Sequence, residues 1–338
     1  CCIRCTVNPI IQILVHVRVA MRRLLPILLF AMLLIPTPVQ AVPPADIPNQ
    51  GVLGGFSLET NSSNNTNPAL AGGIMNEIQV VEVYTATWCD NCIDSEHALM
   101  DMLEDESATV LVHHRFIGEA EDPFGTQEGD DRWISLYGEA CKESVGIERA
   151  PPTVIMDGDR LKVGSSPNER DNLHDEYADM FADRNQFRTS GEYSSDISWA
   201  GNNSSGVLEW SAILPGDSDF TWNHRVMVVE DSAYFPDGSN GLDYYEDVVR
   251  KVINIEPVNT ENDGSSTHVS GVVNLELPNA WDGDDLSLVV VHEWHSPEVL
   301  ECLIPEGCDG DEDSGLLPSF LAPIGLIALG AAALTRRD

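Results

Sequence analysis

Residues 78–92 read IQVVEVYTATWCDNC, and this stretch decides the fold. Its first eight residues are rich in β-branched and aromatic side chains, which predicts a buried strand. Beyond Cys89, the apolar residues Leu99 and Leu103 stand one helical turn apart. The stretch therefore predicts a strand that runs directly into a helix, with Cys89 and Cys92 in the first turn of that helix.

The spacing of the two cysteines is suited to disulfide exchange. Exchange needs one thiol that is ionised at the working pH and a second thiol close enough to release the mixed disulfide. A helix N-terminus lowers the pKa of a thiol placed there, because its free amide groups and dipole favour the thiolate. The same spacing also fits a structural disulfide of an exported protein. A third alternative is half of a zinc site, whose further ligands would come from His113, His114, His292 and His295.

Strands and helices alternate on both sides of the cysteines, over residues 75–188. Residues 108–116 alternate between apolar and polar side chains, as expected for a strand, and residues 131–144 have the spacing of a helix. A short strand over 153–156 is closed by a turn, and a further helix follows up to about Phe187. This alternation indicates an α/β layer fold.

The cysteine stretch, together with Pro152-Thr153 before the short strand, resembles the thioredoxin superfamily over residues 75–188. The resemblance implies that Cys89 attacks a substrate disulfide, that Cys92 resolves the mixed disulfide, and that Pro152 follows a cis peptide bond and shapes the substrate groove. Trp88 and Thr153 would support that groove. The implied partners are protein thiols and disulfides and a further redox partner, with no metal and no cofactor.

Shorter strings resemble one subgroup of that superfamily. These strings are residues 122–125, 228–231 and 248–251. They resemble outer-membrane-associated proteins in which a thioredoxin domain is followed by a β-sandwich.

Three positions depart from the thioredoxin pattern. Val83 stands where a buried Asp is usual in the strand, and Glu82 is expected to point to the other face of the sheet. Ile93 replaces the usual proline after the second cysteine. Asp90 places a negative charge beside the attacking thiol, which opposes thiolate formation. These departures predict a reducing or isomerising protein rather than a strong oxidant.

After residue 188 the pattern becomes all-β. Residues 208–214 and 269–277 alternate between apolar and polar side chains, and clusters of Gly, Asn, Asp and Pro separate the predicted strands. Several short strands with turn signals between them predict an Ig-like β-sandwich over 189–300.

The N-terminal 74 residues are expected to lie outside both domains. Residues 1–20 precede the first methionine and read as upstream translation. Residues 21–41 contain two arginines, an apolar run and a small-residue cleavage site, which is the pattern of a secretory signal peptide. Residues 42–74 are rich in Pro, Gly, Asn and Ser, which predicts a disordered tether.

The C-terminal segment predicts an anchor. Residues 301–315 form an acidic linker in which Cys302 and Cys308 are expected to pair as a structural disulfide. Residues 316–335 include an uncharged apolar run that is long enough to cross a membrane, and Arg336 and Arg337 follow it. By the positive-inside rule these arginines are cytoplasmic and the bulk of the protein is extracytoplasmic. The order of Pro318-Ser319-Phe320, the apolar run and the paired arginines resembles the C-terminal sorting signals of surface proteins in archaea and some bacteria.

The charge balance is strongly acidic. The sequence has 18 Lys and Arg against 55 Asp and Glu, which gives a formal net charge of −37. Such a field repels nucleic acid, and no basic patch indicates nucleic-acid binding.

The sequence therefore predicts an extracytoplasmic, membrane-anchored thiol–disulfide oxidoreductase at the cell surface. The alternative is a non-catalytic surface module, in which the thioredoxin-like domain is a scaffold and the β-sandwich binds a partner.

Overall fold

The computed structural model describes residues 41–61, 65–67, 79–104, 106–116, 122–183, 193–215, 220–264 and 266–296. The predicted upstream segment, nearly all of the signal peptide, the Cys302–Cys308 pair and the C-terminal anchor lie outside these residues. Within the described ranges, no helix is long and apolar enough to span a membrane.

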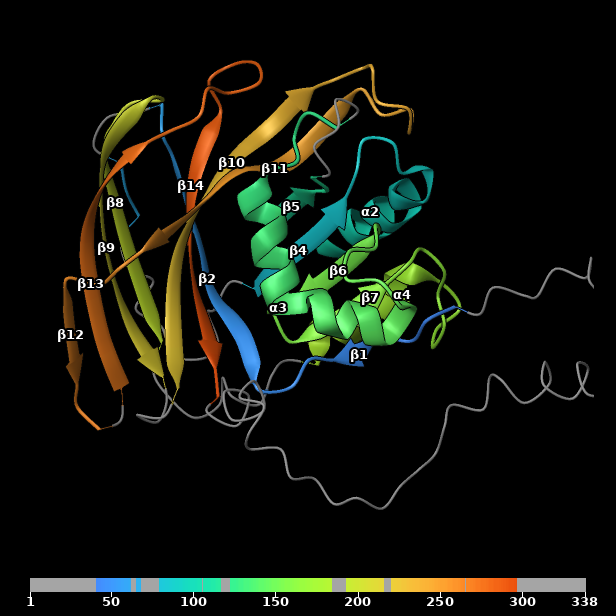
Figure 1. The fold of residues 1–338 in the computed structure, drawn as a ribbon, viewed down its shortest axis with the longest axis horizontal. Coiled ribbons are helices and arrows are strands. Elements are labelled where there is room, and N and C mark those ends of the chain that lie inside the picture. Colours follow the sequence, from blue (N-terminus) through green and yellow to red (C-terminus); the bar gives the residue numbers. More distant parts are fainter. Residues whose placement is uncertain are drawn as a thin grey trace, which may run out of the picture.

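The strands of the described residues form two sheets (Figure 1). The first has nine strands in the order β1-β7-β6-β4-β5-β11-β10-β14-β2, and the second has five in the order β12-β13-β9-β8-β3. The strands of the first sheet are β1 (Ala45–Asp46), β2 (Gln50–Glu59), β4 (Gln79–Thr85), β5 (Ala108–His114), β6 (Thr153–Met156), β7 (Arg160–Val163), β10 (Thr221–Tyr234), β11 (Tyr244–Ile255) and β14 (Leu286–His295). Those of the second are β3 (Asn65–Asn67), β8 (Ser194–Gly201), β9 (Ser205–Pro215), β12 (Asn259–Asn262) and β13 (Ser266–Glu276).

The part of the first sheet with the order β7-β6-β4-β5 has a thioredoxin-like fold. β4 pairs in parallel with β5 and antiparallel with β6, and β6 pairs antiparallel with β7. Helices α2 (Asp90–Leu103) and α4 (Leu173–Ala182) pack on one face through a shared apolar cluster. Helix α3 (Gln127–Val145) covers the other face. The predicted α/β layer is therefore confirmed, although α4 ends earlier than expected.

The second sheet packs face to face on the other half of the nine-stranded sheet. Trp199, Trp210 and Leu214 of the second sheet share one buried cluster with Val228 and Leu288 of the first. Alternation of apolar and polar residues along β8 and β9 places their apolar side chains in this cluster. The predicted all-β packing after residue 188 is present.

The two halves are not separated as the sequence suggested. One sheet runs through both, because β11 pairs in parallel with the outer strand β5 at Val248 and Val112. A strand from the second half thus lies along the edge of the thioredoxin-like part and pairs with it at one bridge, which blocks that edge from other chains.

The prediction of a disordered tether over 42–74 is wrong for residues 50–59. These residues form β2, which pairs with β14 along its whole length. The glycines that suggested disorder instead allow close approach: a Cβ on Gly51 would lie 2.5 Å from the indole Nε1 of Trp294. Gly54, at φ 123°, sits beside the register shift between Val290 and Val291.

The nine-stranded sheet curls until β2 approaches the start of β4 and β5. Thr109 donates a hydrogen bond to the carbonyl of Gly55, and Val52 donates one to the carbonyl of Asp157 at 2.7 Å. Valines from both halves meet in the resulting interior, among them Val80 and Val289.

A charged network lies buried at this junction. The Arg132 guanidinium of α3 contacts both Glu82 of β4 and Glu293 of β14, the latter at 2.6 Å between Nε and Oε1. Arg225 approaches the second oxygen of Glu293 at 2.7 Å, and His113 lies 3.0 Å from Glu82. Burial favours a raised pKa for Glu82, but Arg132 and His113 hold its pKa well below the usual range. The network thus joins five elements, α3, β4, β5, β10 and β14, from distant parts of the chain.

Replacement of Arg132 by Met should lower the free energy of unfolding by about 3–5 kcal/mol, because two buried carboxylates would lose the guanidinium that they share. Urea denaturation of Arg132→Met measures this. Lys142→Met is the control: the Lys142–Glu148 pair is exposed, so its loss should cost no more than about 1 kcal/mol.

A triple variant, Glu82→Gln, Arg132→Met and Glu293→Gln, removes the buried charges together and should recover part of the loss. Equal stability of the Arg132 and Lys142 single variants would contradict the role of the network.

Candidate functional site

The cysteine pair lies at the start of α2, where the sequence placed it. Cys89 and Cys92 form a disulfide with a Cα–Cα distance of 5.4 Å. Cys89 is the N-cap of α2 with extended backbone angles, and its amide donates to the carbonyl of Ala86. Cys92 is fully buried, whereas Cys89 retains 7% of its surface exposed. Cys89 is thus the member of the pair that solvent reaches, which suits it for the attacking role.

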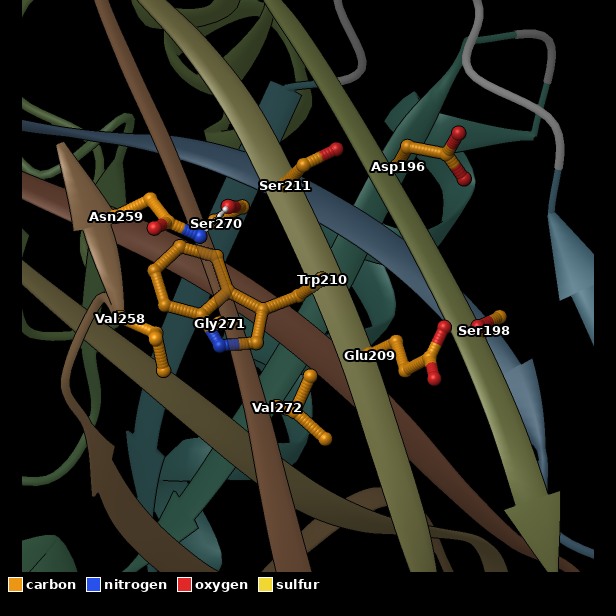
Figure 2. A pocket seen from close by; sticks show the side chains of 10 residues that line it. All are labelled: Asp196, Ser198, Glu209, Trp210, Ser211, Val258, Asn259, Ser270, Gly271 and Val272. Carbon is orange, nitrogen blue, oxygen red and sulfur yellow. Dashed lines mark hydrogen bonds between the residues drawn. The ribbon is translucent and has the colours of Figure 1, made fainter. Parts of the chain in front are cut away.

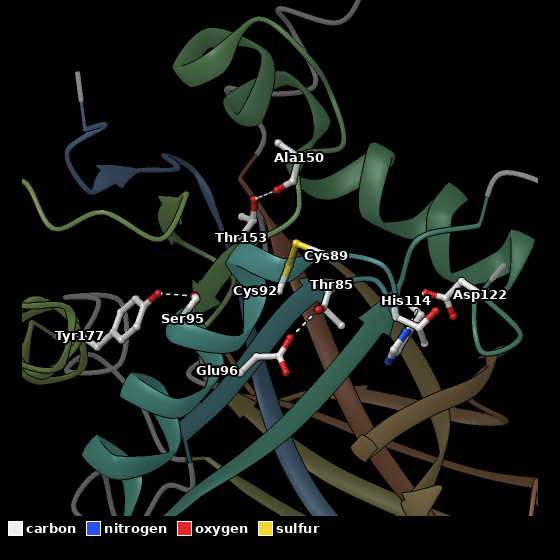
Figure 3. Close-up of a disulfide and its surroundings, with 11 residues drawn as sticks. Thr85, Cys89, Cys92, Ser95, Glu96, His114, Asp122, Ala150, Thr153 and Tyr177 are labelled. Carbon is white, nitrogen blue, oxygen red and sulfur yellow. Dashed lines mark hydrogen bonds and ion pairs between the residues drawn. A yellow bond between two sulfur atoms is a disulfide. The ribbon is translucent and has the colours of Figure 1, made fainter. Parts of the chain in front are cut away.

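Pro152 and Thr153 come to the same edge of the sheet as the cysteines. β6 runs antiparallel to β4, and Thr153 at its start pairs with Tyr84 near the end of β4, just before the cysteine loop. The peptide bond between Pro151 and Pro152 is cis. Thr153 donates a hydrogen bond to the carbonyl of Ala150 on the disulfide's side of the sheet (Figure 3). The topology therefore brings together the two separate motifs that the sequence singled out.

The loop before Cys89 is held from two sides. The amide of Thr87 donates to the carboxylate of Asp122 at 2.9 Å, and Asp122 also pairs with His114 at 3.0 Å. From the second half of the chain, the amide of Asn240 donates to the carbonyl of Thr87 at 3.1 Å. The hydroxyl of Tyr245 fixes the Asn240 side chain at 2.8 Å. The β10–β11 hairpin is therefore part of the site.

Asn240 was missed by the sequence reasoning. The nearby Pro236-Asp237-Gly238 run signals a turn, but no local pattern indicates that this turn reaches a loop about 150 residues earlier in the chain. Asp122 lies in a string that the sequence analysis associated with a subgroup, without a role for its side chain.

A half-buried carboxyl group, that of Glu96, lies one helical turn after Cys92. The hydroxyl of Thr85 at the end of β4 hydrogen-bonds to the carboxyl of Glu96, and Figure 3 shows both side chains on the Cys92 side of the disulfide. Burial raises the pKa of Glu96, and its hydrogen bond to Thr85 and the nearby His114 and His97 only partly oppose the rise. The strand acid that Val83 replaces thus has a counterpart on the helix, at the i+4 position from Cys92.

The neighbouring strand residues point as expected. Val83 packs in the cluster between the sheet and α2, whereas Glu82 faces α3 and joins the Arg132 network. The adjacent histidines His113 and His114 likewise face opposite sides, toward Glu82 and Asp122 respectively. They therefore do not act together on one side of the sheet.

Other groups near the pair set its electrostatics. The Arg115 guanidinium lies 5.8 Å from the centre of the Trp88 ring, which places a cation over the residue before Cys89. Asp90 is exposed and so contributes a solvent-screened negative charge. Cys141 is free and buried, and burial raises the pKa of its thiol to about 11. Cys141 is thus poorly suited to exchange.

A hollow lies on the five-stranded sheet, away from the cysteines (Figure 2). It has a volume of about 510 Å³ and is lined by polar side chains that include Asp196, Glu209 and Ser211, beside the exposed Val258 and Val272. Trp210 lies beneath it, where Gly271 leaves room for the indole.

Comparison with known proteins shows distant structural likeness. No protein-family model matches the chain, and no curated protein matches its sequence. The solved structure of HBP35 of Porphyromonas gingivalis is similar over 65% of this chain and 70% of that protein, with 13% identity and a TM-score of 0.45. Protein AGR_C_4864 from Agrobacterium tumefaciens is similar over 59% of this chain and 78% of its own, with 18% identity and a TM-score of 0.36. The thioredoxin-like assignment rests on strand order and on the cysteine pair.

Glu96→Gln should be more stable than the wild type at pH 7–8. The folded-state pKa of Glu96 lies above its unfolded value, so its contribution to stability is complete below about pH 4.5 and is lost as pH rises through the folded pKa. Gln cannot ionise and keeps a partner for Thr85.

Urea denaturation across pH 4–8 tests this prediction, with the exposed Glu139→Gln on α3 as the matched control. A gap in stability that stays constant over this range, or that matches the control, would contradict the buried-carboxyl assignment.

Proposed function

We propose that this chain is a thiol–disulfide oxidoreductase in which Cys89 attacks and Cys92 resolves. The observation that carries the proposal is the convergence of the Cys89–Cys92 disulfide at the start of α2 with Pro152-Thr153 at the neighbouring strand end. The helix N-terminus favours the thiolate of Cys89. The chemistry of the pair needs no cofactor.

The proposed reduction of a substrate proceeds in two exchanges. The Cys89 thiolate attacks one sulfur of the substrate disulfide; that bond breaks, a Cys89–substrate disulfide forms, and the leaving sulfur takes a proton from water. Cys92 then loses its proton and attacks the Cys89 sulfur, and the second substrate sulfur leaves and is protonated. Two electrons pass to the substrate, and the pair ends as the Cys89–Cys92 disulfide. An external dithiol returns it to the reduced state.

Glu96, one helical turn after Cys92, is assigned to accept the proton of Cys92, and its hydrogen bond with Thr85 holds the carboxyl in place. The raised pKa of Glu96 lies closer to neutral pH than that of an ordinary carboxyl, and a group whose pKa is near the working pH both accepts and returns a proton readily. Glu96 is therefore the proposed acid–base group of the resolving step, and Thr85 positions it.

The direction of the redox reaction and the cellular location of the protein belong to the same proposal. Asp90 and the absence of an acid at Val83 favour a reducing or isomerising role. The signal-peptide pattern and the C-terminal apolar run support an extracytoplasmic protein anchored to the cell membrane by its C-terminal helix. Its partners would be protein thiols and disulfides and a separate redox partner, with nucleic acid excluded by charge.

The alternative function is a non-catalytic binding module. The hollow on the five-stranded sheet favours it, because a hollow of about 510 Å³ away from the cysteines has no role in disulfide exchange. The disulfide would then be structural. The low exposure of Cys89 is compatible with this role.

Reduction of insulin disulfides by the full chain, with a dithiol as reductant, tests the choice. Cys89→Ser should abolish turnover, because the attacking thiolate is lost, and Cys92→Ser should trap a mixed disulfide with the substrate. Cys141→Ser is the control and should keep its activity. A wild-type protein without activity would favour the binding module.

The proton-transfer role of Glu96 is tested in the same assay through its pH profile. Glu96→Gln should lower the rate by about 10²-fold, the lower end of what a positioned acid–base group contributes. The ascending limb of the rate profile should shift toward higher pH, where Cys92 ionises unaided. A uniform loss at all pH values, with no shift, would show that Glu96 is structural only.

A further inference from the structure

We propose that a cavity between α2 and β11 binds an aliphatic cation, that is, a primary ammonium on a short hydrocarbon stem. The cavity has a volume of about 150 Å³. It lies where the thioredoxin-like half meets the β10–β11 hairpin, and both halves supply its walls. The cavity shares Glu96 with the proposed cysteine chemistry, but the cation would bind at Asp247, which has no part in that chemistry.

The floor and one wall of the cavity are apolar. Val110 and Val112 of β5 and Leu99 and Met100 of α2 line it. Met100 is 45% exposed, which is high for such a side chain. Apolar walls of this kind hold a short hydrocarbon stem by removing its surface from water.

Acidic side chains line the cavity on two sides. Glu96 comes from α2, and Glu246 and Asp247 come from β11; His97 and His114 also line the cavity, whereas neither Lys nor Arg does. Asp247 is half-buried, and no hydrogen-bond donor or cation contacts its carboxylate within the described part of the chain. Burial, together with the nearby Asp231 and Glu246, raises the pKa of Asp247 to about 6. A cation placed beside Asp247 would relieve both the desolvation and the repulsion.

The backbone holds Asp247 in an uncommon conformation. Its φ is 54°, in the left-handed region, within a strand whose neighbours have ordinary angles. Such a conformation costs free energy and is often kept where a side chain must point in a particular direction. Asp247 is among the residues that line the cavity.

The combination selects one chemistry. An anion is repelled by the three acids and by the net charge of −37. A hydrocarbon without charge would leave Asp247 unpaired. An ammonium on a stem of about four carbons fits both features, because the stem would contact the apolar residues and the ammonium would pair with Asp247. Two sources carry this group: a free alkylamine and the side chain of a lysine in a polypeptide.

The test uses the full chain at pH 7.5 and constant ionic strength, with n-butylammonium chloride as probe and 1-butanol as its uncharged counterpart. Binding is followed by the NMR shifts of the Met100 and Val112 methyl groups. Butylammonium should bind about ten-fold more tightly than butanol, which corresponds to one charge-assisted hydrogen bond.

Asp247→Asn should remove this preference, whereas Asp237→Asn, an exposed acid of the same hairpin outside the cavity, should leave it unchanged. Since neither residue belongs to the cysteine site, insulin reduction by both variants reports separately on the redox proposal.

Two peptides separate the sources of the cation: Gly-Lys-Gly, and the same tripeptide with norleucine in place of lysine. Binding of the lysine peptide supports a polypeptide side chain as ligand, and binding of butylammonium alone supports a free amine. Equal binding of butanol and butylammonium, or an unchanged preference in Asp247→Asn, would overturn the proposal.

Discussion

The buried contact of Arg132 with Glu82 and Glu293 is the constraint on which the rest of the structure depends. It joins α3 to a strand from each half of the chain. Charges buried this deeply are tolerated only when their partners are in place. The network therefore forms only when the sheet is curled and α3 lies against it. The apolar contacts around the network would also hold the elements close, but they are less directional. The network therefore specifies how the two halves meet.

The geometry of the candidate site depends on how the two halves of the chain pack together. Asn240 reaches the loop before Cys89 because β11 has joined the edge of the thioredoxin-like sheet. The carboxylate of Asp122 accepts a hydrogen bond from the same loop, at the amide of Thr87. An isolated thioredoxin-like domain would lack the first of these contacts. The second half of the chain thus acts as a wall of the site, rather than as an appended module.

Local chemistry was readable from the sequence, and long-range pairing was not. The strand, the helix and both cysteines followed from the pattern around Cys89, and Glu82 faced away from the cysteines as alternation required. The strand β2 was missed because Gly54 and Gly55 resemble a flexible tether until β14 is placed against them. Glu96 could have been found as the acid one turn after Cys92. Asn240 could not, since its contact depends on the pairing of β5 with β11, which involves a single bridge between Val112 and Val248.

The pairing of β2 with β14 sets an order of events in folding. Thr60 at the end of β2 bonds to Leu286, 226 residues later in the chain. β2, the first long strand of the described chain, can therefore pair only after β14, the last one, has been synthesised. Contacts between residues so far apart in the sequence form slowly. Until then β2 is an unpaired, apolar edge, which is prone to associate with other chains. A chain cut short before residue 286 would keep this edge of β2 unpaired.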